Sequence, residues 1–128
     1  MGTQFLFTAM DLDDYEQLKA FAKKIYSKIG SVYCPLLDDF VCFTNQGFDH
    51  LVRKDHKFRT RSEQLRRFAL IPHLKDIVMD PKAEIHLDES RGVRFWILVK
   101  HIDGKRVRVV IMESGSRKIF LSVYPPKE

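Results

Sequence analysis

The spacing of hydrophobic residues divides the chain into an N-terminal helical part and a C-terminal part built of strands. Along residues 11–29 the apolar side chains recur three and four positions apart, which predicts an amphipathic helix. A short helix is expected over residues 48–54, and another is expected to begin at Ser62 as its N-cap. Because Pro72 interrupts this last segment, a separate short helix is expected over residues 73–79.

Beyond Pro81 the hydrophobic period falls to two, which indicates strands. Four strands are expected, at residues 83–88, 93–102, 105–113 and 118–124. The pairs Asp103-Gly104 and Ser114-Gly115 are typical of tight turns, so these strands should form an antiparallel meander. The apolar run at residues 40–44 is expected to be a buried strand or an extended segment. We therefore predict an α+β protein whose N-terminal helices pack on a C-terminal four-stranded antiparallel sheet.

Alternation along the last two strands predicts which side chains share a face of the sheet. In the last strand, Ile119, Leu121 and Val123 are expected on one face, and Lys118, Phe120, Ser122 and Tyr124 on the other. In the strand before it, Val107, Val109 and Ile111 alternate with two arginines. The face away from the helices should then be polar, cationic and partly aromatic, with Arg106, Arg108, Ser122 and Tyr124.

The composition is that of a single ordinary domain over residues 1–128, in which residues 1–39 are an N-terminal helical segment and residues 40–124 the core. No apolar run approaches the roughly 20 residues that span a bilayer, and no signal peptide is evident. We therefore expect a cytoplasmic protein with no membrane partner. Cys34 and Cys42 fit neither a redox pair nor a zinc knuckle, so both are expected to be free thiols.

The net charge of +5 is unevenly distributed along the chain. Residues 45–77 carry eight basic and four acidic side chains, whereas residues 1–44 carry four basic and six acidic ones. Such a basic patch is the usual footprint of a polyanion partner such as RNA, although it also occurs in proteins without one.

The strongest concentration of chemically useful side chains lies within residues 50–61. This segment contains His50, Arg53, Lys54, His56, Lys57, Arg59 and Arg61. A metal site is not expected, because His50 and His56 are six residues apart, whereas ligands on one helix face are three or four apart. A serine or cysteine hydrolase is not expected either, since there is no GxSxG motif and Cys34 lies in an apolar setting. No cofactor is expected.

Imidazole and guanidinium groups together fit the metal-free cleavage of RNA. One imidazole removes the proton of the 2′-hydroxyl, a second protonates the leaving 5′-oxygen, and fixed cations stabilise the phosphorane. The product would be a 2′,3′-cyclic phosphate. Residues 50–61 contain these groups, and the polar sheet face could supply further contacts.

Several short motifs occur in a familiar order: Val-Cys-Phe-Thr, His-Leu-x-Arg-Lys-x-His, Ile-Pro-x-Leu-x-x-Ile-Val-x-Asp-Pro and Phe-Leu-Ser-Val-Tyr. Over about residues 40–124 this order resembles the barnase/EndoU/colicin/RelE-like nuclease superfamily, in particular its branch in phages and mobile elements. The resemblance implies an RNase fold and metal-independent endoribonuclease activity, often that of a toxin. It leaves open an antitoxin or immunity protein as a partner besides RNA.

The motifs and the charge pattern together give two sets of candidate residues. The catalytic candidates are His50, His56, Lys54, Ser122 and Tyr124. The candidates for binding RNA phosphates are Arg53, Arg59, Arg61, Arg106, Arg108 and Arg117. Which histidine is the acid and which is the base stays open.

Two other functional classes stay open beside the ribonuclease: a non-catalytic RNA- or protein-binding module on the same fold, and an inert structural domain. Arginines 59, 61, 66 and 67 are expected to form either a solvated helix face or a non-specific contact with the RNA backbone. Three further histidines, His73, His86 and His101, are expected to be ordinary surface or core residues. Trp96 is expected to belong to the core.

Overall fold

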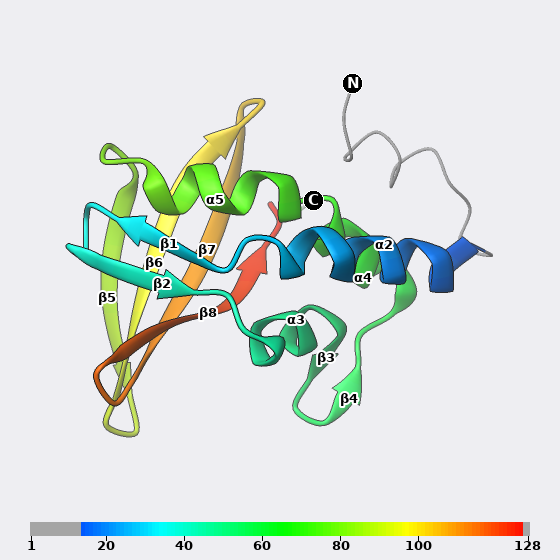
Figure 1. Ribbon diagram of the computed structural model, residues 1–128, viewed down its shortest axis with the longest axis horizontal. Helices are drawn as coiled ribbons and strands as arrows, with labels where there is room; N and C mark the ends of the chain where they lie inside the picture. Colours follow the sequence, from blue (N-terminus) through cyan, green and yellow to red (C-terminus); the bar gives the residue numbers. More distant parts are fainter. Residues whose placement is uncertain (1–13, 127–128) are drawn as a thin grey trace.

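In the computed structural model, which describes residues 14–126, the amphipathic segments form helices and the alternating segments form strands (Figure 1). The helices are α2 (Tyr15–Ser27), α3 (Asn45–Val52), α4 (Arg61–Phe68) and α5 (Ile71–Met79). The strands are β1 (Ser31–Cys34), β2 (Asp39–Cys42), β3 (Arg53–Lys54), β4 (Lys57–Phe58), β5 (Glu84–Ser90), β6 (Val93–Ile102), β7 (Lys105–Ser114) and β8 (Arg117–Tyr124). The α+β class is confirmed, while the start predicted for the first helix, at residues 11–13, lies outside the described residues.

The main sheet has six strands in the order β1-β2-β8-β7-β6-β5, and β3 and β4 form a separate hairpin. The meander from β5 to β8 is antiparallel, as the turn signals predicted. The prediction of a four-stranded, purely antiparallel sheet is wrong, because β2 joins β8 in parallel and β1 pairs with β2. Strands β1 and β2 have four residues each, too few to show a clear alternation in the sequence.

Three helix boundaries differ from the prediction for local reasons. Thr60 rather than Ser62 is the N-cap of α4, since its Oγ1 accepts a hydrogen bond of 3.2 Å from the backbone N–H of Glu63. Helix α5 begins at Ile71 and has Pro72 in its first turn, where the missing N–H leaves no helical bond unmade. Helix α3 ends at Val52, earlier than predicted, because the chain continues directly into β3. It also starts earlier than predicted, at Asn45.

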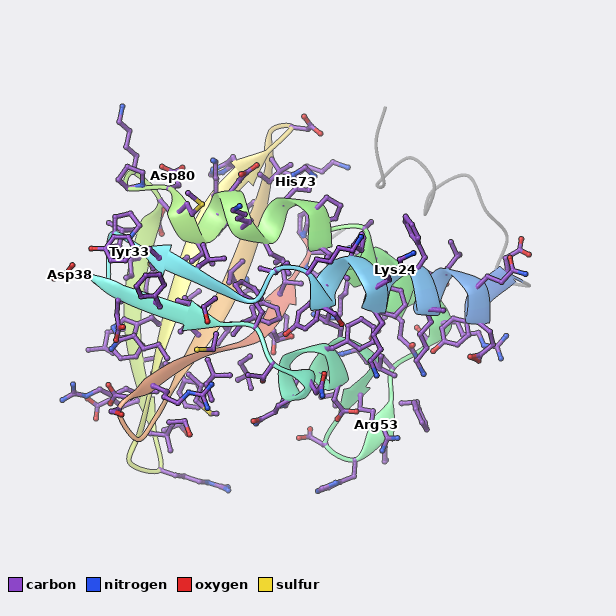
Figure 2. The ribbon with its side chains drawn as sticks, in the orientation of Figure 1. Lys24, Tyr33, Asp38, Arg53, His73 and Asp80 are labelled. Carbon is purple, nitrogen blue, oxygen red and sulfur yellow. The ribbon has the colours of Figure 1, made fainter. Side chains whose placement is uncertain are left out.

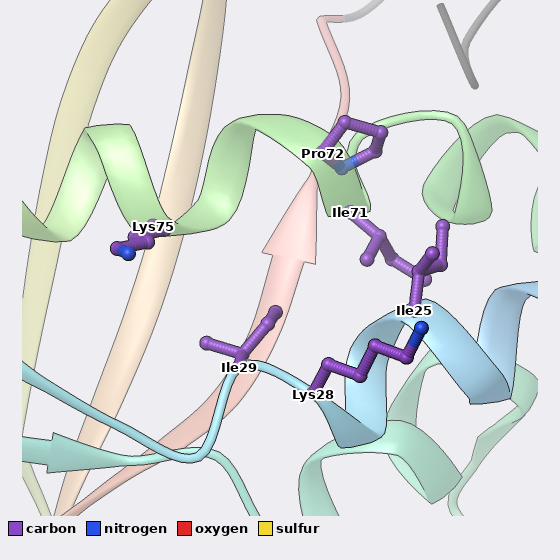
Figure 3. A pocket seen from close by; sticks show the side chains of 6 residues that line it. All are labelled: Ile25, Lys28, Ile29, Ile71, Pro72 and Lys75. Carbon is purple, nitrogen blue, oxygen red and sulfur yellow. The ribbon is translucent and has the colours of Figure 1, made fainter.

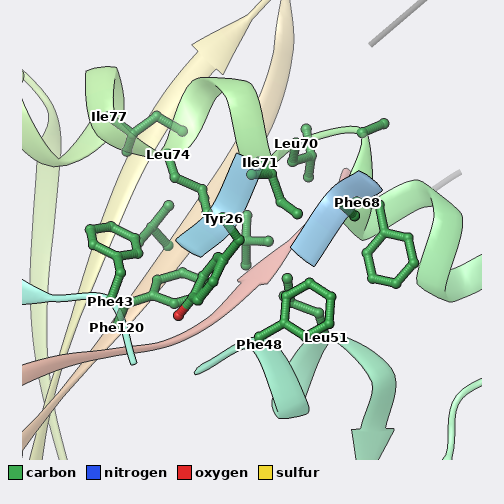
Figure 4. Close-up of a cluster of buried hydrophobic side chains, with 14 of the residues drawn as sticks. Tyr26, Phe43, Phe48, Leu51, Phe68, Leu70, Ile71, Leu74, Ile77 and Phe120 are labelled. Atoms are coloured by element: carbon green, nitrogen blue, oxygen red, sulfur yellow. The ribbon is translucent and has the colours of Figure 1, made fainter. Parts of the chain in front are cut away.

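An aromatic cluster in the core joins α2, α3 and β8 (Figure 4). The ring centre of Tyr26 lies 5.4 Å from that of Phe48 and 5.9 Å from that of Phe120, and Phe43 stacks on Phe120 at 4.9 Å. The hydroxyl of Tyr26 donates a hydrogen bond of 2.7 Å to the carbonyl oxygen of Thr44. Burial raises the pKa of this hydroxyl above its ordinary value.

A β-bulge in β8 changes the predicted distribution of side chains between the two faces of the sheet. Val110 pairs with Ser122, but the next residue, Ile111, pairs with Phe120, so Leu121 is the extra residue. Phe120 therefore points into the core, where it is fully buried, and the prediction that it shares a face with Ser122 is wrong. Lys118 and Ile119, which precede the bulge, therefore also lie on the faces opposite to those predicted. Ser122, Val123 and Tyr124, which follow it, lie on the predicted faces.

Helix α5 packs on one face of the sheet, and the core lies between them (Figure 1). We call the opposite face of the sheet the outer face. Strand pairing places on it Glu84 and His86 of β5, Val99 and His101 of β6, Arg106 and Arg108 of β7, and Ser122 and Tyr124 of β8. None of the helices in residues 14–126 has the length and apolar character needed to cross a membrane.

Candidate functional site

The predicted histidine-rich segment forms the end of α3 and the β3–β4 hairpin. His50 lies partly buried in the last turn of α3, whereas His56 lies exposed at the hairpin tip with a φ of 67°. Lys54 is exposed on β3. Helix α3 lies between this hairpin and β8 (Figure 1). Within residues 14–126 neither imidazole forms a hydrogen bond or an ion pair with the other, or with Ser122 or Tyr124. These histidines therefore do not link residues 50–61 to the polar face of the sheet.

Two of the predicted phosphate-binding arginines are held at this hairpin by local contacts. Arg53, which is labelled in Figure 2, forms an ion pair with Asp49 at 3.5 Å, and its guanidinium lies 4.5 Å from the centre of the Phe58 ring. The Nε–H group of Arg59 donates a hydrogen bond of 3.0 Å to the carbonyl oxygen of His50. The bond of Arg59 ties the chain after the hairpin back to the end of α3.

Two more of the predicted phosphate-binding arginines, Arg61 and Arg117, lie on different elements. The guanidinium of Arg61, at the start of α4, lies 4.8 Å from the centre of the Tyr15 ring. Arg117, at the start of β8, hydrogen-bonds Cys42, and this bond is the main reason that the pKa of the Cys42 thiol is lowered. A second bond, from the hydroxyl of Ser31, acts in the same direction. Both cysteines of the chain are free, as predicted.

The remaining predicted residues, Arg106, Arg108, Ser122 and Tyr124, lie on the outer face of the sheet. The prediction that these four side chains share one face is confirmed. Arg108 stands directly opposite Tyr124, and Val110 stands opposite Ser122. The guanidinium of Arg108 lies 5.4 Å from the centre of the Tyr124 ring. Ser122 is 1% exposed, and its Oγ has no hydrogen-bond partner in the part of the chain that the structure describes. The functional roles of these residues, and of Arg106 beside them, stay predictions.

Another group on the same face consists of Arg106, a predicted phosphate-binding residue, and three side chains to which the sequence assigned no functional role. The Glu84 carboxylate contacts Nε2 of His86 on its own strand and lies 3.5 Å from Nη2 of Arg106 on β7. His101 stands directly opposite Arg106. The pKa of the Glu84 carboxyl is lowered, chiefly by the hydrogen bond from His86 and further by the charges of Arg106 and His101. We call Glu84, His86, His101 and Arg106 the acid–base cluster; the three side chains in direct contact are about half exposed, so a ligand can reach them.

Arg67 is one of the four arginines that were expected on a solvated helix face or in non-specific contact with the RNA backbone. It is 7% exposed, its guanidinium lies 4.8 Å from the centre of the Tyr124 ring, and its Nη1 donates a hydrogen bond to the carbonyl oxygen of Val123. Burial lowers the pKa of Arg67 to about 10, and the charge of Arg59 contributes to this shift. The expectation of a solvated helix face is therefore wrong at this position, because α4 turns Arg67 toward β8.

A signal for the acid–base cluster was present in the sequence. Alternation in the first predicted strand already places Glu84 and His86 on one face. What the sequence lacked was the order of the strands, which brings Glu84 within reach of Arg106 across β6. For Arg67 there was no such signal, since its neighbours Leu65 and Phe68 were the expected apolar positions of that helix.

A shallow groove on the helical side of the sheet contains none of these candidates (Figure 3). Its volume is about 230 Å³, and it is lined by Ile25, Lys28, Ile29, Ile71, Pro72 and Lys75. Among residues 14–126 there is also no group of three or more His, Cys, Asp or Glu side chains placed to hold a metal ion.

The outer face thus brings together a carboxylate, two imidazoles and several guanidinium groups from α4 and three neighbouring strands, β5, β6 and β7. Such a surface can bind anions and move protons. The chain matches no protein-family model, no curated protein and no solved structure. Its function must therefore be inferred from the geometry of this face.

Proposed function

We propose that this protein is a metal-independent endoribonuclease whose reaction centre is the acid–base cluster. The observation that carries the proposal is the contact of the Glu84 carboxylate with both His86 and Arg106, with His101 on the strand between them. A carboxylate, two imidazoles and a guanidinium are the groups that phosphodiester cleavage needs when no metal takes part. The net charge of +5 and the resemblance of residues 40–124 to nucleases support RNA as the substrate.

The contacts of the cluster suggest a role for each group. Because a carboxylate only accepts hydrogen bonds, Nε2 of His86 carries the proton that Glu84 accepts. Nδ1 of this neutral imidazole keeps its lone pair and takes the proton of the 2′-hydroxyl. Glu84 then stabilises the imidazolium that forms at His86. Arg106 stabilises the negative charge on the phosphorane oxygens.

The reaction is balanced by a second imidazole. As the 2′-oxygen bonds to phosphorus, the bond from phosphorus to the 5′-oxygen breaks. His101, in its protonated form, gives a proton to the leaving 5′-oxygen. The products are a 2′,3′-cyclic phosphate and a 5′-hydroxyl, and the two histidines finish with their protonation states exchanged.

The hairpin histidines are the rival source of the acid and the base. His50 and His56 lie close in sequence to many cations, but neither contacts another titratable side chain in the described part of the chain. The outer-face groups are favoured because their mutual contacts orient the imidazole of His86 before substrate binds.

The test is incubation of the full chain with RNA in EDTA, with analysis of the product ends. His86→Ala and His101→Ala should each lower the cleavage rate by about 100-fold or more, the usual contribution of one acid or base. His73→Ala, on α5 (Figure 2), is the matched control and should cut like the wild type. A wild type that cuts nothing rules out the enzyme. Full activity in both outer-face variants, with loss in a His50→Ala/His56→Ala double variant, would move the reaction centre to the hairpin.

One observation favours a second candidate, an RNA-binding module that does not cleave. Glu84, His86 and Arg106 are about half exposed, and water at such a surface weakens the electrostatic stabilisation of a transition state. Salt-dependent RNA binding by the wild type, with no cleavage product after prolonged incubation, would select this alternative.

A further inference from the structure

A cluster of arginines lies where α4 meets β8. The guanidiniums of Arg67 and Arg108 lie 4.8 Å and 5.4 Å from the centre of the Tyr124 ring, so two positive charges face one aromatic side chain. Arg59 is near enough for its charge to lower the pKa of Arg67, whereas the charges of Tyr124 and Glu63 act in the opposite direction. Over residues 14–126, Arg59, Arg67 and Arg108 form no ion pair with a carboxylate.

The position of Arg67 is energetically unfavourable without a counter-ion. Its side chain is almost completely buried, its Nη1 bonds the Val123 carbonyl oxygen, and its Nε has no hydrogen-bond partner among the residues that the structure describes. Removing a cation from water without neutralising it costs free energy, and so does leaving a buried donor unpaired. An anion bound at this junction would relieve both costs.

Ser122 adds a second, independent observation at the same junction. Its Oγ is buried and has no partner within residues 14–126. Ser122 and Tyr124 are two residues apart on β8 and lie on the same face, so the hydroxyl stands next to the aromatic ring that the arginines contact. A hydroxyl donates readily to a phosphate oxygen. An unpaired donor of α4 and an unpaired donor of β8 therefore both belong to residues beside Tyr124.

We infer that Arg67, Arg108, Ser122 and Tyr124 form a second phosphate-binding site beside the acid–base cluster. Arg106 and Arg108 are two residues apart on one face of β7, which separates them by about 7 Å along the strand. This separation is comparable with that of successive phosphates on an extended nucleic-acid strand. The identity of the ligand rests on the proposed function: the substrate is an oligoribonucleotide with at least two phosphodiesters, one for each site.

The first experiment tests the anion site without RNA. Replacing chloride with inorganic phosphate at constant ionic strength should raise the Tm of the wild type. The rise should be at least halved in Arg67→Gln and in Arg108→Gln, whereas Arg94→Gln, an exposed arginine next to Glu89, should respond like the wild type. Arg108→Gln keeps the test valid if loss of Arg67 prevents folding. Equal rises in all variants would overturn the second site.

The second experiment tests whether the anion is an RNA phosphate. A fluorescent 2′-O-methyl trinucleotide, which cannot be cleaved, is titrated by anisotropy at several salt concentrations. For every phosphate that the protein no longer neutralises, the slope of log K against log salt should become shallower by about 0.7. Arg67→Gln and Arg106→Gln should each show this change, and the double variant should show about twice as much because the two sites hold different phosphates.

The outcomes separate the two proposals. If Arg106→Gln makes the slope shallower and Arg67→Gln does not, the second site is wrong and the proposed function stands. If the double variant changes the slope no more than either single variant, both arginines hold one phosphate and the two-phosphate substrate is wrong. If the wild type does not bind the trinucleotide at all, RNA is not the ligand and the proposed function fails, whatever the response to inorganic phosphate.

Discussion

Replacing Gly47 with alanine should destabilise the protein, although alanine is the better helix former. Gly47 lies in the first turn of α3, where the helix packs against β8. A Cβ at this position would lie 2.4 Å from the hydroxyl oxygen of Tyr26, 2.6 Å from the carbonyl oxygen of Phe120 and 2.7 Å from its Cδ2. Real Cβ atoms essentially never make contacts this short, so one of these groups must move.

The magnitude follows from terms of opposite sign. Helix propensity favours alanine over glycine by about 1 kcal/mol. Overpacking a filled core costs about 1–3 kcal/mol, and the upper end applies because the obstacles are backbone and two side chains that are buried almost completely. Displacing the Tyr26 hydroxyl would also break its bond to the Thr44 carbonyl, at a further cost of about 1 kcal/mol. The free energy of unfolding should therefore fall by about 3 kcal/mol.

Equilibrium unfolding in urea measures this loss. The control is Gln46→Ala, at the preceding exposed position of the same helix, which should change stability by no more than about 0.5 kcal/mol. In a Tyr26→Phe background, where one of the three obstacles is gone, Gly47→Ala should cost less than in the wild type. If Gly47→Ala leaves the urea midpoint unchanged or raises it, α3 does not pack this closely on β8.

Two further properties can be checked with single variants. Cys42 should react with iodoacetamide faster than Cys34 at about pH 7.5, because the bond from Arg117 lowers the pKa of Cys42 whereas burial raises that of Cys34. Mass spectrometry gives both rates, and Arg117→Ala should slow the reaction at Cys42; equal rates at the two thiols would contradict the assignment. The backbone N–H of Lys82 and the ammonium group of Lys100 lower the pKa of Asp80. The stabilising contribution of Asp80 is therefore complete above its unfolded pKa of about 3.9 and is lost as pH falls through the folded value. Asp80→Asn should therefore lower the urea midpoint at about pH 6 and leave it unchanged at about pH 2, and an equal loss at both pH values would refute this cause.

The meander could be predicted from the sequence because its strands are long and its turns are formed by neighbouring residues. Strands β6 and β7 have ten residues each, so the period of two is clear over their length. The turn between them was recognisable from Asp103-Gly104, and both residues adopt the positive φ values that a tight hairpin requires, 53° and 77°. The apolar run at residues 40–44 pointed to a strand, and β2 lies there, but its parallel pairing with β8 could not be predicted, since β8 lies more than seventy residues later in the chain.

The bulge at Leu121 shows the limit of alternation as a guide. The amino-acid pattern of β8 reads as an uninterrupted strand, yet one extra residue turns Phe120 into the aromatic core. The position of the bulge is set by packing of Phe120 against Tyr26 and Phe43, which belong to other elements. The sequence of the strand itself does not encode these partners.

On the outer face, the shared side of Arg106 and Arg108 could be predicted from the sequence, because alternation is a property of any extended backbone. The residues that these two arginines contact depend on how the strands and helices pack together. The strand order brings Glu84 to Arg106 across β6, and the packing of α4 on β8 buries Arg67. Both depend on contacts between segments far apart in the chain, whose energy comes from packing and charge rather than from local conformational preference.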